Sequence, residues 1–264
     1  MNRLDFKWLL LIIYALIIAL FLVDWGQVDV QVGKLVYLLG PLTALVAGGF
    51  TLKQIGLEGP RAFVLKIIIA ALGLWLLGEA VTLYYSIIQI EPYPSIIDVF
   101  FLTGYVTFSL AVLFEIRLFK LDLRKLDSSV RLLLAGSFLV LFGIVVYFGI
   151  MSYSPEESFI INFVTLSWSL GDLLMGGLGL VLLAMVWEYR KGAVKSIWLW
   201  FVFAAFTNLV ADIIYNINPE AVFEGSSLTT FLDVMWVGAY VLFAGYFMQL
   251  LKETKKIEAK LLNK

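Results

Sequence analysis

Carboxylates inside apolar runs are the residues of this chain that could do chemistry. Five of them have almost wholly hydrophobic neighbours: Glu79, Asp98, Asp172, Asp212 and Asp233. One acid at the centre of a membrane helix costs roughly 2.5 to 3.5 kcal/mol on insertion scales, so five cannot all face lipid. We therefore expect these side chains to face other helices or water.

The chain contains no histidine and no cysteine. This excludes disulfides, thiolate metal sites, cysteine nucleophiles, and histidine as a ligand or general base. Carboxylates without a neighbouring base can share protons, bind a hard metal such as Ca²⁺ or Mg²⁺, or hold a cationic ligand among aromatic rings. The sequence leaves these three alternatives open and implies no particular metal or cofactor.

Two of the acids have a local structural explanation. The segments PSIIDVFFLTGY at 94–105 and TTFLDVMWVGAY at 229–240 share a hydroxyl residue three positions before an aspartate. This spacing is typical of a capping box, and an acid in the first turn also suits the helix dipole. We predict helix capping by Ser95, Asp98, Thr230 and Asp233. A tyrosine follows each aspartate by seven positions, and we expect Tyr105 and Tyr240 to pack rather than to contact a ligand.

Glu79, Asp172 and Asp212 have no such explanation. Asn208, Asp212 and Tyr215 follow the i, i+4, i+7 spacing that places side chains on one helix face, and Trp75 stands one turn before Glu79. We predict that these side chains line a polar ligand-binding cavity, with a purely structural polar network as the alternative. The predicted ligand-binding residues are Trp75, Glu79, Asp172, Asn208, Asp212 and Tyr215.

The elements that position these residues are membrane helices. Hydrophobic residues make up 62% of the chain, charged residues only 15%, and the mean hydropathy is +0.96, which exceeds what a soluble domain carries. The apolar runs predict an all-α integral membrane protein with eight transmembrane helices near 7–23, 34–53, 62–88, 96–116, 131–151, 159–187, 196–215 and 229–250. The lack of cysteine, with few asparagines and many isoleucines and lysines, is typical of a thermophile.

Positive charge alternates between the connections. Of the 19 lysines and arginines, all except Lys34 fall on one side of the predicted helices, from Arg3 and Lys7 to the five lysines after span eight. By the positive-inside rule both termini are cytoplasmic. The opposite connections are acidic, with Asp24, Asp29, Glu91, Glu156, Glu157, Glu220 and Glu224. Topology alone explains the basic side, so the chain needs no nucleic-acid partner, and the lipid bilayer is its expected surrounding.

The eight predicted helices resemble two parallel four-helix repeats. PLTALVAGGF at 41–50 aligns with SLGDLLMGGL at 169–178, GEAVTLYY at 78–85 with ADIIYNIN at 211–218, and IIDVFFLTGY at 96–105 with FLDVMWVGAY at 231–240. Units that each cross the membrane four times share one orientation and are related by an axis along the membrane normal. We predict a single membrane domain over 1–264, with repeats at about 1–120 and 130–251 and a short cytoplasmic tail at 252–264.

The segments LGLWLLGEAVTLYY and PYPSIIDVFFLTGYVTFSLAVLF resemble the multi-span N-terminal membrane region of bacterial diguanylate cyclases with GGDEF domains and of some histidine kinases. The resemblance implies a region that senses an extracytoplasmic or membrane signal and passes it to a cytoplasmic effector. After Leu251 only KETKKIEAKLLNK follows, with no cyclase or kinase sequence. The resemblance therefore favours a stand-alone sensor or receptor-like module, with an acidic pocket open to the extracytoplasmic side, that acts through a cytoplasmic signalling partner or another membrane subunit.

Two other classes remain open. SLGDLLMGG around Asp172 resembles the Gly-x-Gly-Asp motif of intramembrane aspartyl proteases and the Gly-Asp segment of the eight-span lysoplasmalogenases. In a membrane-embedded hydrolase, Asp172 and Asp212 would be the catalytic pair that activates water. Ser169 replaces the first protease glycine, and the missing histidine departs from the lysoplasmalogenases. A small-molecule or ion transporter is the third class, although only Pro41 interrupts a predicted helix.

Overall fold

The protein is helical throughout the part of the chain that the structure, a computed structural model, describes. That part comprises residues 6–23, 29–90, 92–119, 124, 126–188, 193–217 and 226–262. Its helices are α1 (Phe6–Phe21), α2 (Asp29–Tyr37), α3 (Leu39–Ile55), α4 (Pro60–Ile88), α5 (Ile96–Phe119), α6 (Ser128–Met151), α7 (Phe159–Glu188), α8 (Ala193–Ile217) and α9 (Ser227–Leu262). Several residues that belong to the charge pattern or to the repeat lie outside the described residues: Arg3, Asp24, Glu91, Lys120, Lys125, Arg190, Lys191, Asn218, Glu220, Glu224 and Lys264.

The helices have the length and composition of membrane spans. Seven described stretches are long and apolar enough to cross a bilayer when α2 and α3 count as one, and α1 is a shorter apolar helix of 16 residues. The chain is therefore an all-helical, multi-pass membrane protein. The predicted helix at 34–53 begins earlier and breaks near Leu38. Pro41 lacks an N–H and so cannot donate to the carbonyl of Tyr37, which explains why α2 ends there.

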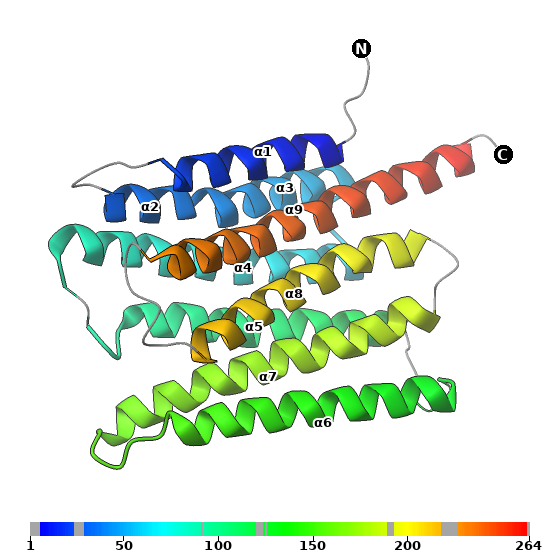
Figure 1. Cartoon of the computed structure of the whole chain (residues 1–264). Coiled ribbons are helices and arrows are strands. Elements are labelled where there is room, and N and C mark those ends of the chain that lie inside the picture. The colour runs from blue at the N-terminus through cyan, green and yellow to red at the C-terminus, as the bar shows by residue number, and fades with distance from the viewer. Residues whose placement is uncertain are drawn as a thin grey trace.

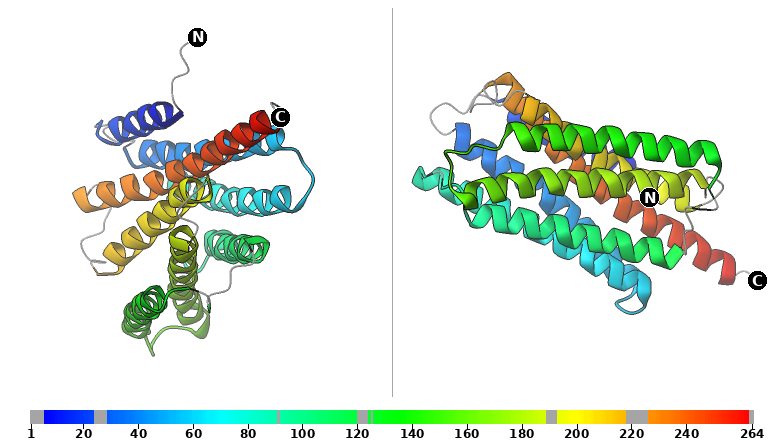
Figure 2. Two further views of the ribbon diagram at one scale, coloured as in Figure 1. Left: turned by 90° about the vertical axis from the view of Figure 1, so that its right-hand side faces the viewer. Right: turned by 90° about the horizontal axis from the view of Figure 1, so that it is seen from below.

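The bundle is built around α9. In the 18-residue apolar stretch of each membrane helix, 72% of the residues are buried in α9 but only 17% in α6. This places α9 at the centre of the bundle and α6 on its flank. Helix α9 packs against α8, α3 and α1, while α5 packs against α4 and α7 and α6 packs against α7 (Figures 1 and 2). Phe108 of α5 and Phe243 of α9 are both fully buried, and their ring centroids lie 4.9 Å apart at the middle of the main core.

The two ends of the bundle differ. Helix α1 begins and α9 ends at one end, named here the tail end, and α4 passes into α5 at the opposite or head end (Figure 1). Helix α9 has 36 residues, about 54 Å at 1.5 Å per residue, whereas the apolar core of a bilayer measures about 30 Å. Its last turns accordingly project past α1 and α8 at the tail end (Figures 1 and 2).

Candidate functional site

A cap fixes the start of α5 at the head end. The backbone N–H of Ser95 donates to Oδ2 of Asp98 at 2.7 Å, and Oγ of Ser95 accepts from the N–H of Ile97 at 3.1 Å. These reciprocal bonds satisfy backbone donors that the first turn leaves without helical partners. They also hold the Asp98 carboxylate in one orientation, with its second oxygen pointing away from its own helix.

The predicted cap at Thr230 is wrong. Helix α9 begins three residues earlier, where Oγ of Ser226 accepts from the N–H of Thr229 at 3.0 Å. Thr230 lies within the first turn and donates its hydroxyl to the carbonyl of Ser226 at 3.3 Å. The segment SSLTT offers several hydroxyls, and the earliest of them takes the capping position. Asp233 therefore lies in the second turn and does not cap α9.

A cavity of about 520 Å³ lies at the head end, near the cap of α5. Three of the five singled-out acids line it, and they come from three helices: Asp98 from α5, Asp172 from α7 and Asp212 from α8. Asp98 and Asp172 are only 6% and 7% exposed, so each carboxyl has access to little besides the cavity. The remaining lining residues are Tyr93, Ser152, Thr165, Trp168, Ser169, Tyr215, Asn216 and Trp236.

Asp172 and Asp212 meet at the hydroxyl of Tyr105. This hydroxyl lies 3.2 Å from Oδ1 of Asp172 and 3.4 Å from Oδ2 of Asp212. The two carboxyls are also within hydrogen-bonding reach of each other, so one proton can be shared between them. Asn208 supports the pair from behind, because its Nδ2 donates to Oδ2 of Asp212 at 2.6 Å and to the Tyr105 hydroxyl at 3.4 Å.

Two indole groups hold the other carboxylate oxygens. Nε1 of Trp168 donates to Oδ1 of Asp98 at 3.0 Å, and Nε1 of Trp236 donates to Oδ1 of Asp212 at 2.8 Å. Tyr215, predicted as a ligand contact, lies beside Trp236 with ring centroids 6.2 Å apart and is 45% exposed. The acids thus share the cavity lining with the aromatic side chains of Trp168, Tyr215 and Trp236, and rings of this kind attract organic cations.

Three predicted ligand residues, Trp75, Glu79 and Asn208, lie outside the cavity lining, and of these Asn208 is the one that bonds to a lining acid, Asp212. Trp75 is 3% exposed, donates Nε1 to the carbonyl of Phe101 at 3.2 Å and stacks on Phe108 at 5.2 Å, so it is a core residue. Glu79 is likewise absent from the residues that line the cavity with Asp172 and Asp212. The prediction that Trp75 and Glu79 share one site with Asp172 is therefore wrong, because α4 turns Trp75 into the core and Glu79 toward α2 and α9.

Glu79 belongs to a second polar group. Lys34 of α2 is close enough to Glu79 and Asp233 to act on both carboxylates electrostatically, and Asp233 in turn acts on Glu79. Tyr37 and Tyr240 lie beside this group, and the charge of Glu79 acts electrostatically on both hydroxyls. At the cavity, no lysine or arginine is among the groups that act electrostatically on Asp172 and Asp212. Among the described residues, none of these four acids forms a salt bridge, with Lys34 or with any other base.

Sequence reasoning missed several polar contacts. Tyr105 was expected to pack, yet its hydroxyl joins two acids, and Trp168 and Trp236 were not considered. These contacts join helices far apart in sequence, so no local pattern could reveal them. Glu115 was also overlooked. It is fully buried toward the tail end and pairs with Arg61, and an acid near the end of an apolar run would have been a sufficient signal.

The cavity can bind a donor-rich or cationic molecule. Among the described residues, no group of three acids comes close enough together to hold one metal ion. The three lining carboxylates offer more acceptor positions than are occupied by the donors from five residues: Ser95, Tyr105, Asn208, Trp168 and Trp236. A ligand with N–H donors or a positive charge would complement this surface.

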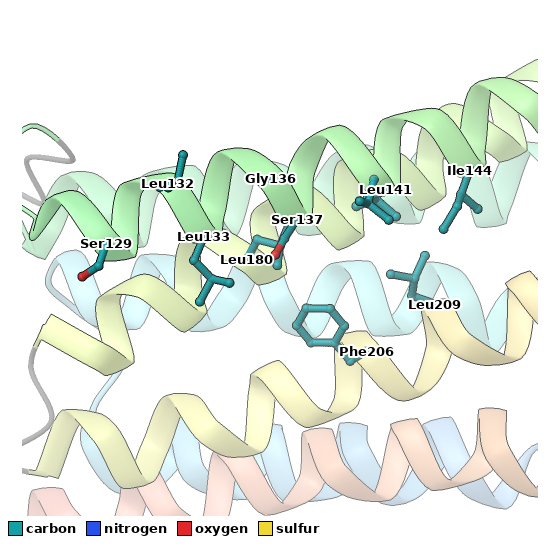
Figure 3. Close-up of a pocket in the computed structure, with 11 residues that line it drawn as sticks. Ser129, Leu132, Leu133, Gly136, Ser137, Leu141, Ile144, Leu180, Phe206 and Leu209 are labelled. Atoms are coloured by element: carbon teal, nitrogen blue, oxygen red, sulfur yellow. The ribbon is translucent and has the colours of Figure 1, made fainter.

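A larger groove of about 790 Å³ lies between α6 and α8, and no charged residue lines it. Its walls are leucines, Phe206 and a few small residues, as the close-up in Figure 3 shows. Because it adjoins the least buried helix, it suits an acyl chain better than a polar ligand. The acidic cavity is therefore the candidate functional site.

Comparisons with known proteins provide no relative. No protein-family model matches the chain, and no curated protein or solved structure matches it either.

Proposed function

We propose that this protein is a receptor-like sensory module of the cell membrane. Its acidic cavity takes a ligand from the extracytoplasmic side, and α9 carries the response to a cytoplasmic partner. The observation that carries the proposal is that Asp98, Asp172 and Asp212, from three separate helices, line one cavity. Acids at membrane depth are costly, so their convergence on a cavity favours a functional role over a packing role.

Helix α9 provides the connection between the two ends. Trp236 binds Asp212 at the cavity, and the helix then continues without a break to Leu262. Between these points Phe243 and Phe247 are fully buried, and Nε2 of Gln249 donates to Oγ of Ser196 on α8 at 3.0 Å. A shift of Trp236 would therefore be transmitted along a tightly packed helix rather than absorbed by a loop.

The projecting end of α9 offers a surface to a partner. Ile257 and Leu261 are 54% and 67% exposed and lie four residues apart, on one face of the helix. Lysines of this end add positive charge, in line with the predicted cytoplasmic tail. The resemblance of LGLWLLGEAVTLYY and PYPSIIDVFFLTGY to the membrane regions of diguanylate cyclases and histidine kinases supports the same direction of signalling.

A photo-crosslinking experiment tests the proposal. A photoreactive amino acid replaces Ile257 in the full chain, expressed in its native membrane, and Leu132 on the exposed flank of α6 is the control position. We expect one defined partner at position 257 and none at 132, with a crosslink yield that changes at least about twofold in Asp212→Asn. A yield that does not respond to Asp212→Asn, in protein that unfolds like the wild type, overturns the proposal.

A membrane-embedded hydrolase is a second candidate, favoured by the placement of the Tyr105 hydroxyl against both Asp172 and Asp212. Two carboxyls that share a proton can act as base and acid toward one water molecule. The test is incubation of the reconstituted protein with a lysophospholipid mixture in ¹⁸O-labelled water. Label in a released product, lost in Asp172→Asn and Asp212→Asn, would support the hydrolase, and no incorporation would remove it.

A further inference from the structure

The two polar groups have matching members. In the predicted repeat, Glu79 corresponds to Asp212, Asp233 to Asp98, and Tyr240 to Tyr105. Asp233 acts electrostatically on Glu79 in the group with Lys34, while Asp98 and Asp212 line the cavity. Each tyrosine lies near the acid of the other repeat: the Tyr105 hydroxyl contacts Asp212, and Glu79 acts electrostatically on Tyr240, as Asp212 also does.

The packing around the two tyrosines also matches. A Cβ atom added at Gly40 would meet the ring of Tyr240 at 3.1 Å, and one added at Gly171 would meet the ring of Tyr105 at 3.1 Å. Tyr37 packs edge-on to Tyr240 at 6.4 Å and 85°, and Trp168 packs edge-on to Tyr105 at 6.1 Å and 89°. Both pairs align the first repeat with the second at a difference of 131 in residue number, Gly40 with Gly171 and Tyr37 with Trp168. Aligning the paired glycines gives a difference of 128 instead.

At the difference of 131, Lys34 corresponds to Thr165. Lys34 supplies the positive charge for Glu79 and Asp233. Thr165 lines the acidic cavity and shares a hydrogen bond of 2.7 Å with the hydroxyl of Tyr93, so it supplies no charge there. The cavity group contains the repeat counterparts of the two acids and the tyrosine found beside Lys34. It differs in two ways: it has a third acid, Asp172, and it has open volume where the other group has a lysine side chain.

Asp172 is the cavity acid that most clearly lacks a positively charged partner. It is 93% buried and lines the cavity, and apart from the neighbouring Asp212 carboxyl, the Tyr105 hydroxyl is its one hydrogen-bond partner among the described residues. A carboxylate offers about four acceptor positions and is costly to bury without a counter-charge. A cation in the cavity would bring an opposite charge near Asp172, as Lys34 does for Glu79 and Asp233.

From this match we infer that the cavity binds an organic ammonium ion, whose positive charge takes the place that Lys34 fills in the other half of the molecule. The inference rests on the proposed function, because it names the ligand class of the same cavity. Trp168, Trp236 and Tyr215 line the cavity with aromatic rings, which favour an ammonium over a hydrated metal ion. A volume of about 520 Å³ falls within the usual range for small-molecule pockets.

The test is the thermal unfolding of the purified full chain with methylammonium or tetramethylammonium chloride, at ionic strength held constant with NaCl. We expect a saturable rise in Tm of roughly 5 °C at a hundredfold excess over Kd. Thr165→Lys, which supplies the charge internally, should weaken this response at least about tenfold. Thr165→Val removes the hydroxyl and its bond to Tyr93 without adding charge, so its response should be larger than that of Thr165→Lys. Lys34→Met changes a residue outside the cavity lining and should keep the response. If Thr165→Lys does not fold, Asp212→Asn serves in its place and should also lose the response.

A wild-type Tm that rises no more with ammonium salts than with NaCl overturns the inference, as does a response that Thr165→Lys and Asp212→Asn leave unchanged. The crosslink at position 257 separates this failure from failure of the proposed function. If the ammonium response is absent but the crosslink still depends on Asp212, only the proposed ligand class is overturned. An ammonium response with a crosslink indifferent to Asp212 supports the ligand class and overturns the sensory coupling.

Discussion

Single side chains at the cavity are held by donors from other helices and, for Asp212, also by Asn208 of its own helix α8. Asp98 accepts from Trp168, Asp212 accepts from Trp236 and Asn208, and Asp172 accepts from Tyr105. Each bond joins a carboxyl to a group whose position is set by packing elsewhere. The carboxyls are therefore fixed before any ligand arrives, which lowers the entropy that binding would have to overcome.

Tyr105→Phe tests the hydroxyl that joins two of these acids. It removes the contacts to Asp172 and Asp212 while keeping the ring, which packs on Gly171 and Trp168. Polar bonds between membrane helices contribute about 0.6 kcal/mol on average and up to about 1.7 kcal/mol. We expect unfolding in mixed micelles to become easier by roughly 1 kcal/mol. Tyr84→Phe, at a 57% exposed position on α4, is the matched control and should change little. Equal stabilities for the two variants would show that the hydrogen bonds of the Tyr105 hydroxyl do not stabilise the fold.

Helices α4 and α5 meet at a close contact that glycine permits. A Cβ atom at Gly104 would lie 2.2 Å from Nε1 of Trp75, closer than any neighbour can tolerate without moving. Trp75 in turn contacts Tyr105, Phe108 and Tyr240, so it joins the cavity tyrosine to the core. The spacing between these two helices therefore decides where Tyr105 lies.

Gly104→Ala should displace the Trp75 ring and lose its hydrogen bond to the carbonyl of Phe101. Overpacking of this kind typically costs 1 to 3 kcal/mol, and we expect a loss of about 2 kcal/mol in a denaturant titration. Gly73→Ala is the control on α4, because nothing lies within 4 Å of its added Cβ. In a helix this change favours folding by up to about 1 kcal/mol. If Gly104→Ala were as stable as Gly73→Ala, the close contact of Trp75 would be refuted.

The helices were largely predictable from the sequence, and the contacts between them were not. Apolar runs with charged ends located the spans, because burial of the backbone in lipid requires helices. The start of α9 was missed because five consecutive residues offered several capping hydroxyls, and local spacing alone could not choose Ser226. Tyr105 and Asp172 lie 67 residues apart and Asp98 and Trp168 lie 70 apart, so only the packing of α5 on α7 brings them together.

The molecule as a whole has a polar head end and a projecting tail end. The cavity and its acids lie at the head end, and the exposed turns of α9 leave the bundle at the tail end (Figure 1). The charge pattern predicts that the tail end faces the cytoplasm. Ligand entry and partner contact would then take place on opposite sides of the membrane, as a sensory module requires.

Cysteine labelling tests this orientation without a background, because the chain has no cysteine. Glu156→Cys places a thiol in the exposed turn between α6 and α7, and Lys260→Cys places one on the exposed end of α9. On intact cells an impermeant maleimide should label position 156 at once and position 260 only after permeabilisation. The reverse pattern would invert the membrane orientation and with it the direction of signalling.

Modification of Ser169→Cys tests the central claim most directly, since Ser169 lines the acidic cavity. Intact cells are treated with a trimethylammonium methanethiosulfonate or with its sulfonate analogue, and rates are normalised to Glu156→Cys. A field from nearby carboxylates worth about 1.4 kcal/mol changes a rate tenfold, so we predict that the cationic reagent reacts at least about ten times faster than the anionic one. This preference should decline toward one when Asp172→Asn and Asp212→Asn are added. Equal rates for the two reagents, or no reaction from outside, would contradict an acidic cavity open to the extracytoplasmic side.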